Sequence, residues 1–130
     1  MEELYSLLFK RRSIRAYTDQ PVEKEKIDKL LQAAMSAPSA CNTQPWEIIV
    51  TQDPEILKEI REALPMARYV VPCAITVCGN TNLCKHTGTM WIQDCSAAME
   101  NILLAAQRWA WDRYGLGFRA WSLLSKRSPR

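Results

Sequence analysis

Two short segments of this chain combine residue types that bind charged and flat molecules. The first is RRSIR at residues 11–15, and the second is PSACNTQPWEI at residues 38–48. In an extended segment side chains alternate, so Arg11, Ser13 and Arg15 would project to one side while Arg12 and Ile14 face the other. Arginine holds phosphate oxygens through two parallel hydrogen bonds, so this edge suits a phosphate group. Taken alone, the spacing favours the plainer alternative of a solvated basic helix end that the helix dipole stabilises.

The second segment offers neutral hydrogen-bonding groups in a turn. They are the Ser39 hydroxyl, the Asn42 and Gln44 amides and the backbone N–H groups beyond a helix end. Next to Pro38 and Trp46, such groups suit the heteroatom edge and the flat apolar face of an isoalloxazine ring. The plainer alternative is a helix-to-strand turn in which Asn and Ser bond their own backbone.

The elements that carry these segments follow from hydrophobic spacing. Leucines at positions 4, 7 and 8 predict a helix over residues 2–10 that ends at the arginines. A second helix is expected from Pro21 to just before Pro38, and residues 46–51 predict a strand. The apolar stripe of this second helix comprises Ile27, Leu30, Leu31, Ala34 and Met35.

The remaining elements are two helices and a strand. Asp53 is expected to cap a third helix with Pro54 at its first position, and residues 74–78 predict a second strand. An alanine-rich helix is expected over residues 92–107, and its narrow face packs either within the chain or against a second copy. The buried stripe of the third helix is predicted as Ile56, Leu57, Ile60 and Leu64, and the narrow face as Cys95, Ala98, Ile102, Ala105 and Ala106.

Length and composition indicate one globular domain. The chain has 130 residues, of which 48% are hydrophobic and 24% charged, which argues against disordered and fibrous classes. The apolar runs are too short for a membrane span and the acidic start lacks a signal-peptide layout, so we expect a cytoplasmic protein without a membrane partner. The net charge is +3, and the excess of basic residues is confined to RRSIR and residues 108–130, so no nucleic-acid partner is expected. A nucleic-acid binder that uses this basic tail remains an alternative.

The cysteines and the histidine do not indicate a metal or catalytic site. The chain has five cysteines, an odd number, and they form no CxxC pair. We therefore expect neither a disulfide framework nor a zinc site. His86 lies in a linking segment, and no catalytic residue is predicted.

Together, RRSIRAY and the later APSACNTQPW resemble the nitroreductase family of FMN-dependent oxidoreductases. The resemblance continues through PCAITVCGN and DCSAAMENILLAA and covers residues 2 to about 107. It implies an α+β fold with a central sheet flanked by helices, in a homodimer with one FMN at each of two shared sites. In such a site Arg11, Arg12, Ser13 and Arg15 would contact the phosphate, ribityl chain and pyrimidine edge, and the partner subunit would bring Pro38, Ser39, Asn42 and Gln44.

The activity implied by this resemblance is hydride transfer from NADH or NADPH through the flavin to a nitroaromatic, quinone or similar flat acceptor. Such chemistry needs no protein acid or base, since the flavin performs the redox step. A cation near N1 and C2=O would favour the reduced anionic flavin, and Arg15 is the best candidate. The alternative is a catalytically weak or inactive flavin-binding dimeric remnant.

The resemblance breaks at the end of the chain. Relatives usually continue with a Gly-x-Gly turn, another strand and a further basic phosphate ligand. Residues 108–130 instead form an atypical basic tail with three of the five tryptophans, so we divide the chain into a nitroreductase-like domain at 1–107 and this tail. Codons for Trp109-Ala110 and Trp111-Asp112, shifted by one base, would both give glycine, which suggests a frameshift near codon 107. The tail is expected to form a Trp-rich helix or to remain loose.

Overall fold

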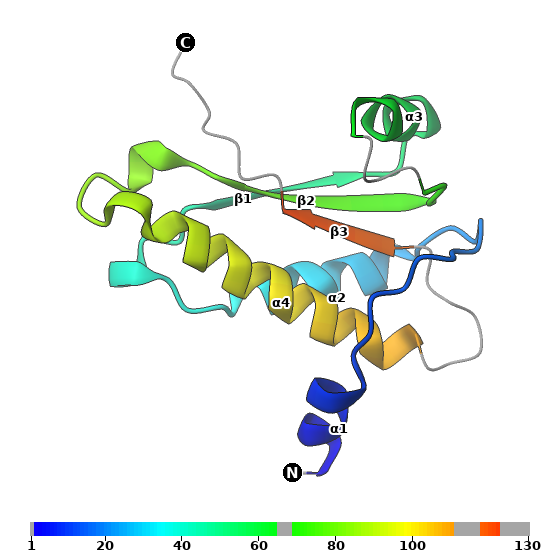
Figure 1. Cartoon of the computed structure of the whole chain (residues 1–130), viewed down its shortest axis with the longest axis horizontal. Coiled ribbons are helices and arrows are strands. Elements are labelled where there is room, and N and C mark those ends of the chain that lie inside the picture. The colour runs from blue at the N-terminus through cyan, green and yellow to red at the C-terminus, as the bar shows by residue number, and fades with distance from the viewer. Residues whose placement is uncertain (1, 65–68, 111–117, 123–130) are drawn as a thin grey trace.

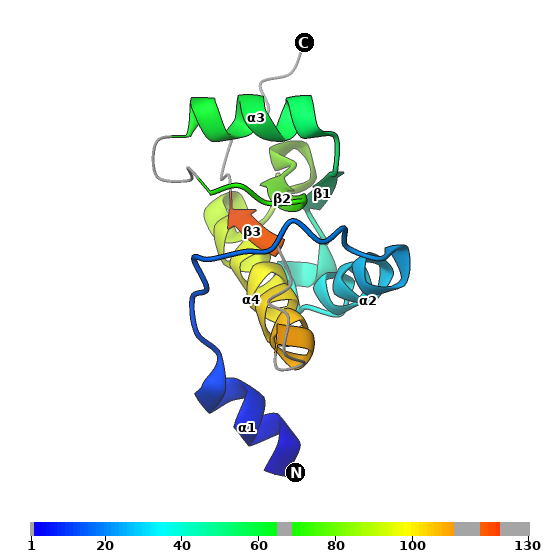
Figure 2. The same ribbon diagram turned by 90° about the vertical axis from the view of Figure 1, so that its right-hand side faces the viewer.

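The computed structural model describes residues 2–64, 69–110 and 118–122 and shows an α+β fold (Figure 1). A small sheet is covered by α3 on one face and by α2 and α4 on the other (Figures 1 and 2). The predicted class, a sheet flanked by helices, is confirmed. The elements are α1 (Glu2–Lys10), α2 (Lys24–Met35), β1 (Trp46–Thr51), α3 (Pro54–Ala63), β2 (Cys73–Gly79), α4 (Trp91–Ala110) and β3 (Phe118–Ser122), with the short 3-10 helices η1 (Ala40–Asn42), η3 (Thr81–Leu83) and η4 (Gly88–Met90).

The sheet has the strand order β1-β2-β3, so β2 lies in the centre. β1 pairs with β2 antiparallel, from Trp46 opposite Gly79 to Thr51 opposite Ala74. β3 pairs with β2 in parallel. The expectation that the tail is helical or loose is therefore wrong for residues 118–122, whose backbone completes the third strand, while residues 111–117 and 123–130 lie outside the described part.

The main core lies between the sheet and the helix pair α2 and α4. Cys95, Ala98 and Ile102 of α4 have no solvent exposure. They share one cluster with Leu30 of α2 and Ile75 of β2. The narrow small-residue face of α4 thus packs within the chain, because small side chains let the helix approach α2 and the sheet closely. α4 also runs to Ala110, past the division that we predicted at residue 107.

Two predicted helix features differ in the structure. α2 begins at Lys24 rather than at Pro21, since Val22 is buried in a second small cluster and belongs to the extended connection. In α3, the side chain of Asp53 accepts hydrogen bonds from two backbone N–H groups, which confirms the predicted cap. Only Leu57 of the predicted α3 stripe is buried, and Ile56 is 49% exposed. Within the described part of the chain, α3 is the single helix on its face of the sheet, so no neighbouring helix covers the rest of the stripe (Figure 1).

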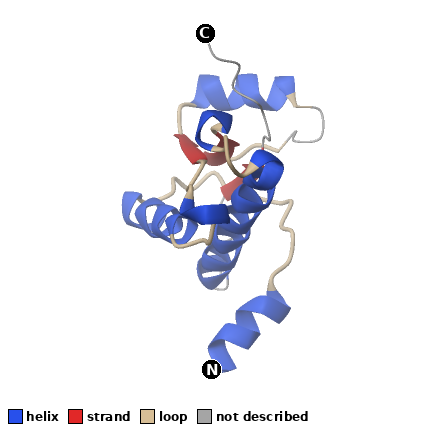
Figure 3. Cartoon of the chain, turned by 90° about the vertical axis from the view of Figure 1, so that its left-hand side faces the viewer, coloured by secondary structure: helices blue, strands red, loops and turns tan. Residues whose placement is uncertain are grey.

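α1 projects away from the body of the chain (Figures 2 and 3). The side chains of Leu4, Tyr5, Leu8 and Phe9 are exposed, from 46% at Leu8 to 73% at Phe9. The rings of Tyr5 and Phe9 stack on one another with centroids 6.3 Å apart. Within the described residues, no helix combines the length and apolar character that a membrane span requires.

Candidate functional site

Residues 39–44, which we call the polar turn, connect α2 to β1 through η1. Three residues of the turn, none of them glycine, adopt left-handed backbone conformations: φ is 51° at Cys41, 53° at Asn42 and 48° at Gln44. Such conformations are uncommon for residues other than glycine and occur preferentially at functional sites. The strained backbone therefore supports a functional role for this turn.

Local hydrogen bonds hold the polar turn together. The Ser39 hydroxyl accepts the Gln44 N–H at 3.0 Å, and the Thr43 hydroxyl donates to the Ala40 carbonyl at 3.0 Å. The Ser39 oxygen thus serves the backbone, as the plainer alternative predicted. The side chains of Asn42 and Gln44 are exposed and make no hydrogen bond to the described residues, so both amides are free to bind a ligand.

A buried carboxylate that sequence reasoning missed connects the polar turn to α4. Asp94 is 4% exposed, and its Oδ1 accepts the N–H of Ala40 at 2.9 Å. Its Oδ2 is buried and has no hydrogen-bond partner in the described chain. The signal was available in the sequence, because Asp94 lies on the same helical stripe as Trp91 and Ala98, and both of these are buried.

The cationic arm, residues 11–15, follows α1 and is exposed apart from Arg11. Arg11 forms an ion pair with α4, with 3.3 Å between its Nε and Glu100 Oε1. Arg12 instead donates from Nη1 to the carbonyls of Phe9 and Arg11 at 2.9 and 2.8 Å, so it caps the end of α1. The plainer alternative of a basic helix end thus fits Arg12, while the guanidinium of Arg15 has no partner among the described residues.

The cationic arm and the polar turn attach to different sides of α4. Their anchors, Glu100 and Asp94, are six residues apart, which is about 9 Å along the axis and about 120° around it. Figure 1 shows the arm towards one end of α4 and η1 beyond the other. One chain therefore does not bring together the predicted site residues, which are Arg11, Arg12, Ser13 and Arg15 on the arm and Pro38, Ser39, Asn42 and Gln44 at the turn.

Comparison with known proteins identifies the family to which both segments belong. Residues 8–67, which include both segments, match the sequence model of the nitroreductase family. The chain is 50% identical over 109 residues to a putative NADH dehydrogenase/NAD(P)H nitroreductase of Archaeoglobus fulgidus, covering 82% of this chain and 63% of that protein. The chain belongs to the nitroreductase family. It also aligns with rat iodotyrosine deiodinase 1 at 35% identity over 100 residues, covering 77% of this chain and 31% of that protein.

Solved structures of nitroreductase-family proteins show the same fold. A putative NADH dehydrogenase/NAD(P)H nitroreductase from Parabacteroides distasonis superposes with a TM-score of 0.76 at 44% identity, covering 82% of this chain and 62% of that one. An FMN-dependent nitroreductase from Clostridium difficile gives a TM-score of 0.72 at 37% identity, covering 80% and 60%. The chain spans only 63% and 51% of two curated relatives that it matches.

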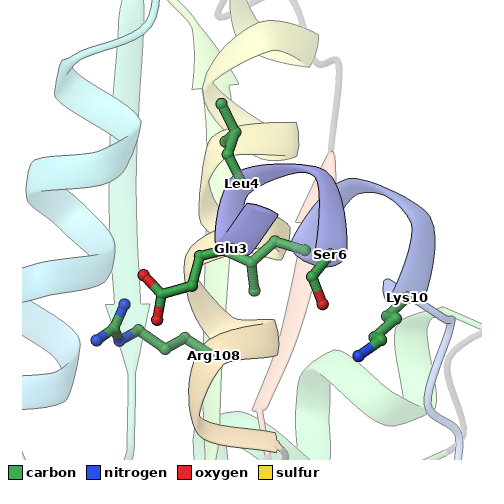
Figure 4. Close-up of a pocket in the computed structure, with 6 residues that line it drawn as sticks. Glu3, Leu4, Ser6, Lys10 and Arg108 are labelled. Atoms are coloured by element: carbon green, nitrogen blue, oxygen red, sulfur yellow. The ribbon is translucent and has the colours of Figure 1, made fainter. Parts of the chain in front are cut away.

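Two hollows of this nitroreductase-family chain lie away from the predicted residues. A cavity of about 450 Å³ lies between α1 and the end of α4, where Glu3 and Arg108 point toward one another (Figure 4). A cleft of about 570 Å³ separates residues 17–21 from α3 and is lined by Lys58 and Arg61. Neither hollow includes a residue of the cationic arm or the polar turn.

The cysteine thiols are free, and two buried ones are unreactive at neutral pH. Burial raises the pKa of Cys73 to about 11. Burial, with the nearby Asp94 carboxylate and two further thiols, raises the pKa of Cys95 to about 11. Only the thiolate is a nucleophile or a metal ligand, so these side chains act as core residues. Among the described residues, no group of three or more His, Cys, Asp and Glu could hold a metal ion.

Proposed function

We propose that this chain is part of an FMN-dependent oxidoreductase that passes hydride from NADH or NADPH to a nitroaromatic, quinone or similar flat acceptor. The observation that carries the proposal is the polar turn, whose left-handed residues present two free amides. Membership of the nitroreductase family supports it, as does the likeness to a protein described as an FMN-dependent nitroreductase. When bound, FMN supplies the hydride acceptance and donation, and the protein supplies binding and orientation.

The cationic arm fits the phosphate end of FMN. Glu100 occupies Nε of Arg11 and fixes the direction of this guanidinium, while both Nη groups stay available for phosphate oxygens. Arg15, exposed four residues further on, would carry its positive charge to the pyrimidine edge of the ring, where reduction places negative charge. Arg12 contributes mainly long-range charge, since its Nη1 caps α1.

The polar turn fits the ring of FMN. An amide carries both donors and an acceptor, so Asn42 and Gln44 match the alternating heteroatoms of the pyrimidine side. Pro38 is exposed beside them and offers an apolar surface to a flat ring. Ser39 contributes chiefly by fixing the turn, because its oxygen accepts the Gln44 N–H.

A homodimer would complete such a site. The arm and the turn lie on different sides of α4, so an arm from a second copy is needed opposite each turn. The exposed side chains of α1 form a large apolar surface to leave in water, and a second copy would cover it; they are Leu4, Tyr5, Leu8 and Phe9. We therefore propose two FMN sites, each shared between subunits.

The competing possibility is a dimeric remnant that binds flavin weakly and does not turn over substrate. It is favoured by the atypical basic and Trp-rich composition of residues 108–130, which departs from the usual ending of the family. A titration with FMN separates the two, because an oxidoreductase must retain flavin and must bleach its absorbance when NADH or NADPH is added. A preparation that binds flavin without bleaching supports the remnant.

The FMN site itself is tested by paired charge removals. Arg11→Ala is expected to weaken FMN binding by roughly tenfold or more, because a charged hydrogen bond contributes about 1.5–3 kcal/mol. Lys24→Ala is the matched control, since it also removes one positive charge but from the exposed face of α2, where Lys24 pairs with Asp28. Equal FMN dissociation constants for the two variants would contradict the assigned phosphate site.

A further inference from the structure

Asp94 is a buried carboxylate that no ion pair compensates within the described residues. It is 4% exposed, and the ion pairs of the described chain join other residues. A buried charge with a single hydrogen bond is unfavourable, and its place in the first turn of α4 offsets only part of this. Packing alone therefore does not explain the carboxylate.

The polar turn requires an anchor outside itself. Left-handed backbone is unfavourable at each of the three residues, and such conformations persist only where surrounding contacts determine them. Ala40 uses both of its backbone groups: its carbonyl accepts from the N–H and the hydroxyl of Thr43, and its N–H donates to Asp94. The last of these bonds ties the turn to α4, across 54 residues of sequence.

We propose that Asp94 is a positioning residue that holds the polar turn in the conformation that presents Asn42 and Gln44 to the flavin. The part of this inference that concerns flavin rests on the proposed function. The bond from Ala40 N–H to Asp94 Oδ1 is charge-assisted and therefore stronger than a neutral one. α4 then orients both segments that one chain contributes to the two shared sites, the turn through Asp94 and the arm through Glu100.

Three substitutions separate the hydrogen bond from the charge. Asp94→Leu removes the acceptor, whereas Asp94→Asn keeps an acceptor oxygen and removes the charge. Ala40→Pro removes the donor, and its Cδ takes the place of the N–H hydrogen, so the Asp94 carboxylate must turn away from the polar turn. The proline is compatible with the backbone, because Ser39 before it is extended, with φ −139° and ψ 153°, and Ala40 is the first residue of η1. Ser96→Ala, at an exposed position of α4, is the control.

The first measurement is amide hydrogen exchange at Asn42 and Thr43 in protein without added flavin, normalised to the amides of β2. We expect exchange to be at least about tenfold faster in Asp94→Leu and Ala40→Pro, and within about threefold of the unsubstituted chain in Asp94→Asn and Ser96→Ala. If Asp94→Leu does not fold, Ala40→Pro decides. Unchanged exchange in Ala40→Pro would overturn the proposal.

The second measurement is the FMN dissociation constant of the same variants. We expect it to rise about tenfold in Asp94→Leu and Ala40→Pro and to be largely restored in Asp94→Asn, a rescue that a purely structural effect of the charge would not give. Faster exchange with unchanged FMN affinity would overturn the connection between the turn and the flavin. If the unsubstituted chain binds no FMN, the proposed function fails, and the exchange rates still decide the role of Asp94.

Discussion

Replacing Gly79 with alanine should destabilise the chain because the new methyl group would collide with a buried tryptophan. A Cβ at this position lies 2.1 Å from Cε3, 2.8 Å from Cζ3 and 2.9 Å from Cδ2 of Trp91. An ordinary contact begins near 3.4 Å, so the indole must move by about 1.3 Å. Trp91 is 6% exposed and begins α4, so it has little free space. We expect Gly79→Ala to lower the free energy of unfolding by about 1–3 kcal/mol.

The collision is measured by a double-mutant cycle in urea, followed by circular dichroism so that the loss of a tryptophan does not alter the signal. Gly79→Ala should cost about 1–3 kcal/mol in the unsubstituted chain and less than about 0.5 kcal/mol after Trp91→Leu has made room. Gly88→Ala is the control: its φ is +57° and nothing lies within 4 Å of the added Cβ, so its cost of about 1 kcal/mol should not depend on residue 91. Additive costs of the Gly79 and Trp91 substitutions would refute the reasoning.

Two further perturbations test the helix cap and the buried thiols. Asp53→Ala should lower the free energy of unfolding by about 1 kcal/mol in urea titrations, because two N–H groups of α3 lose their acceptor, whereas Glu59→Ala on the exposed face should change it little. Burial raises the folded-state pKa of Cys73 and Cys95 to about 11 from an ordinary value of 9.0. Between these two values the unfolded chain loses the thiol protons and the folded chain keeps them, so the free energy of unfolding is unaffected below pH 9 and falls as the pH rises from 9 through 11. The double variant Cys73→Ala, Cys95→Ala should therefore lose less stability than the unsubstituted chain between pH 9 and 11, and parallel pH profiles would contradict this.

Local signals in the sequence predict most of the regular elements. The bounds of β1 and α1 agree with the expected ranges, because apolar spacing and the Pro45 and Asp53-Pro54 boundaries are encoded nearby. The start of α2 was misplaced, since Pro21 is a helix-start signal and the burial of Val22 with Cys73 is a tertiary contact. β3 was missed for a related reason, because its strand depends on pairing with β2 across more than forty residues.

The candidate site was predictable in its residue types but not in its connections. The amides of Asn42 and Gln44 could be identified as ligand groups from the motif, and the structure leaves both unpaired in the described chain. The anchors could not be identified, because the bond from Asp94 to Ala40 and the ion pair from Glu100 to Arg11 exist only once α4 packs against both segments. An acidic residue on an otherwise apolar helix stripe is the sequence feature that would have indicated Asp94.

The central claim is that the arm of one subunit meets the turn of another, and mixing two variants with weakened FMN binding tests it most directly. Arg11→Ala damages the arm and Asn42→Ala damages the turn, so each homodimer should carry two weakened FMN sites. After unfolding and refolding together in equal amounts, half of the dimers are mixed, and each has one site with both segments intact. The account predicts that bound FMN recovers to about a quarter of the unsubstituted level. No recovery above the average of the separate variants, in preparations shown by mass to contain mixed dimers, would contradict it.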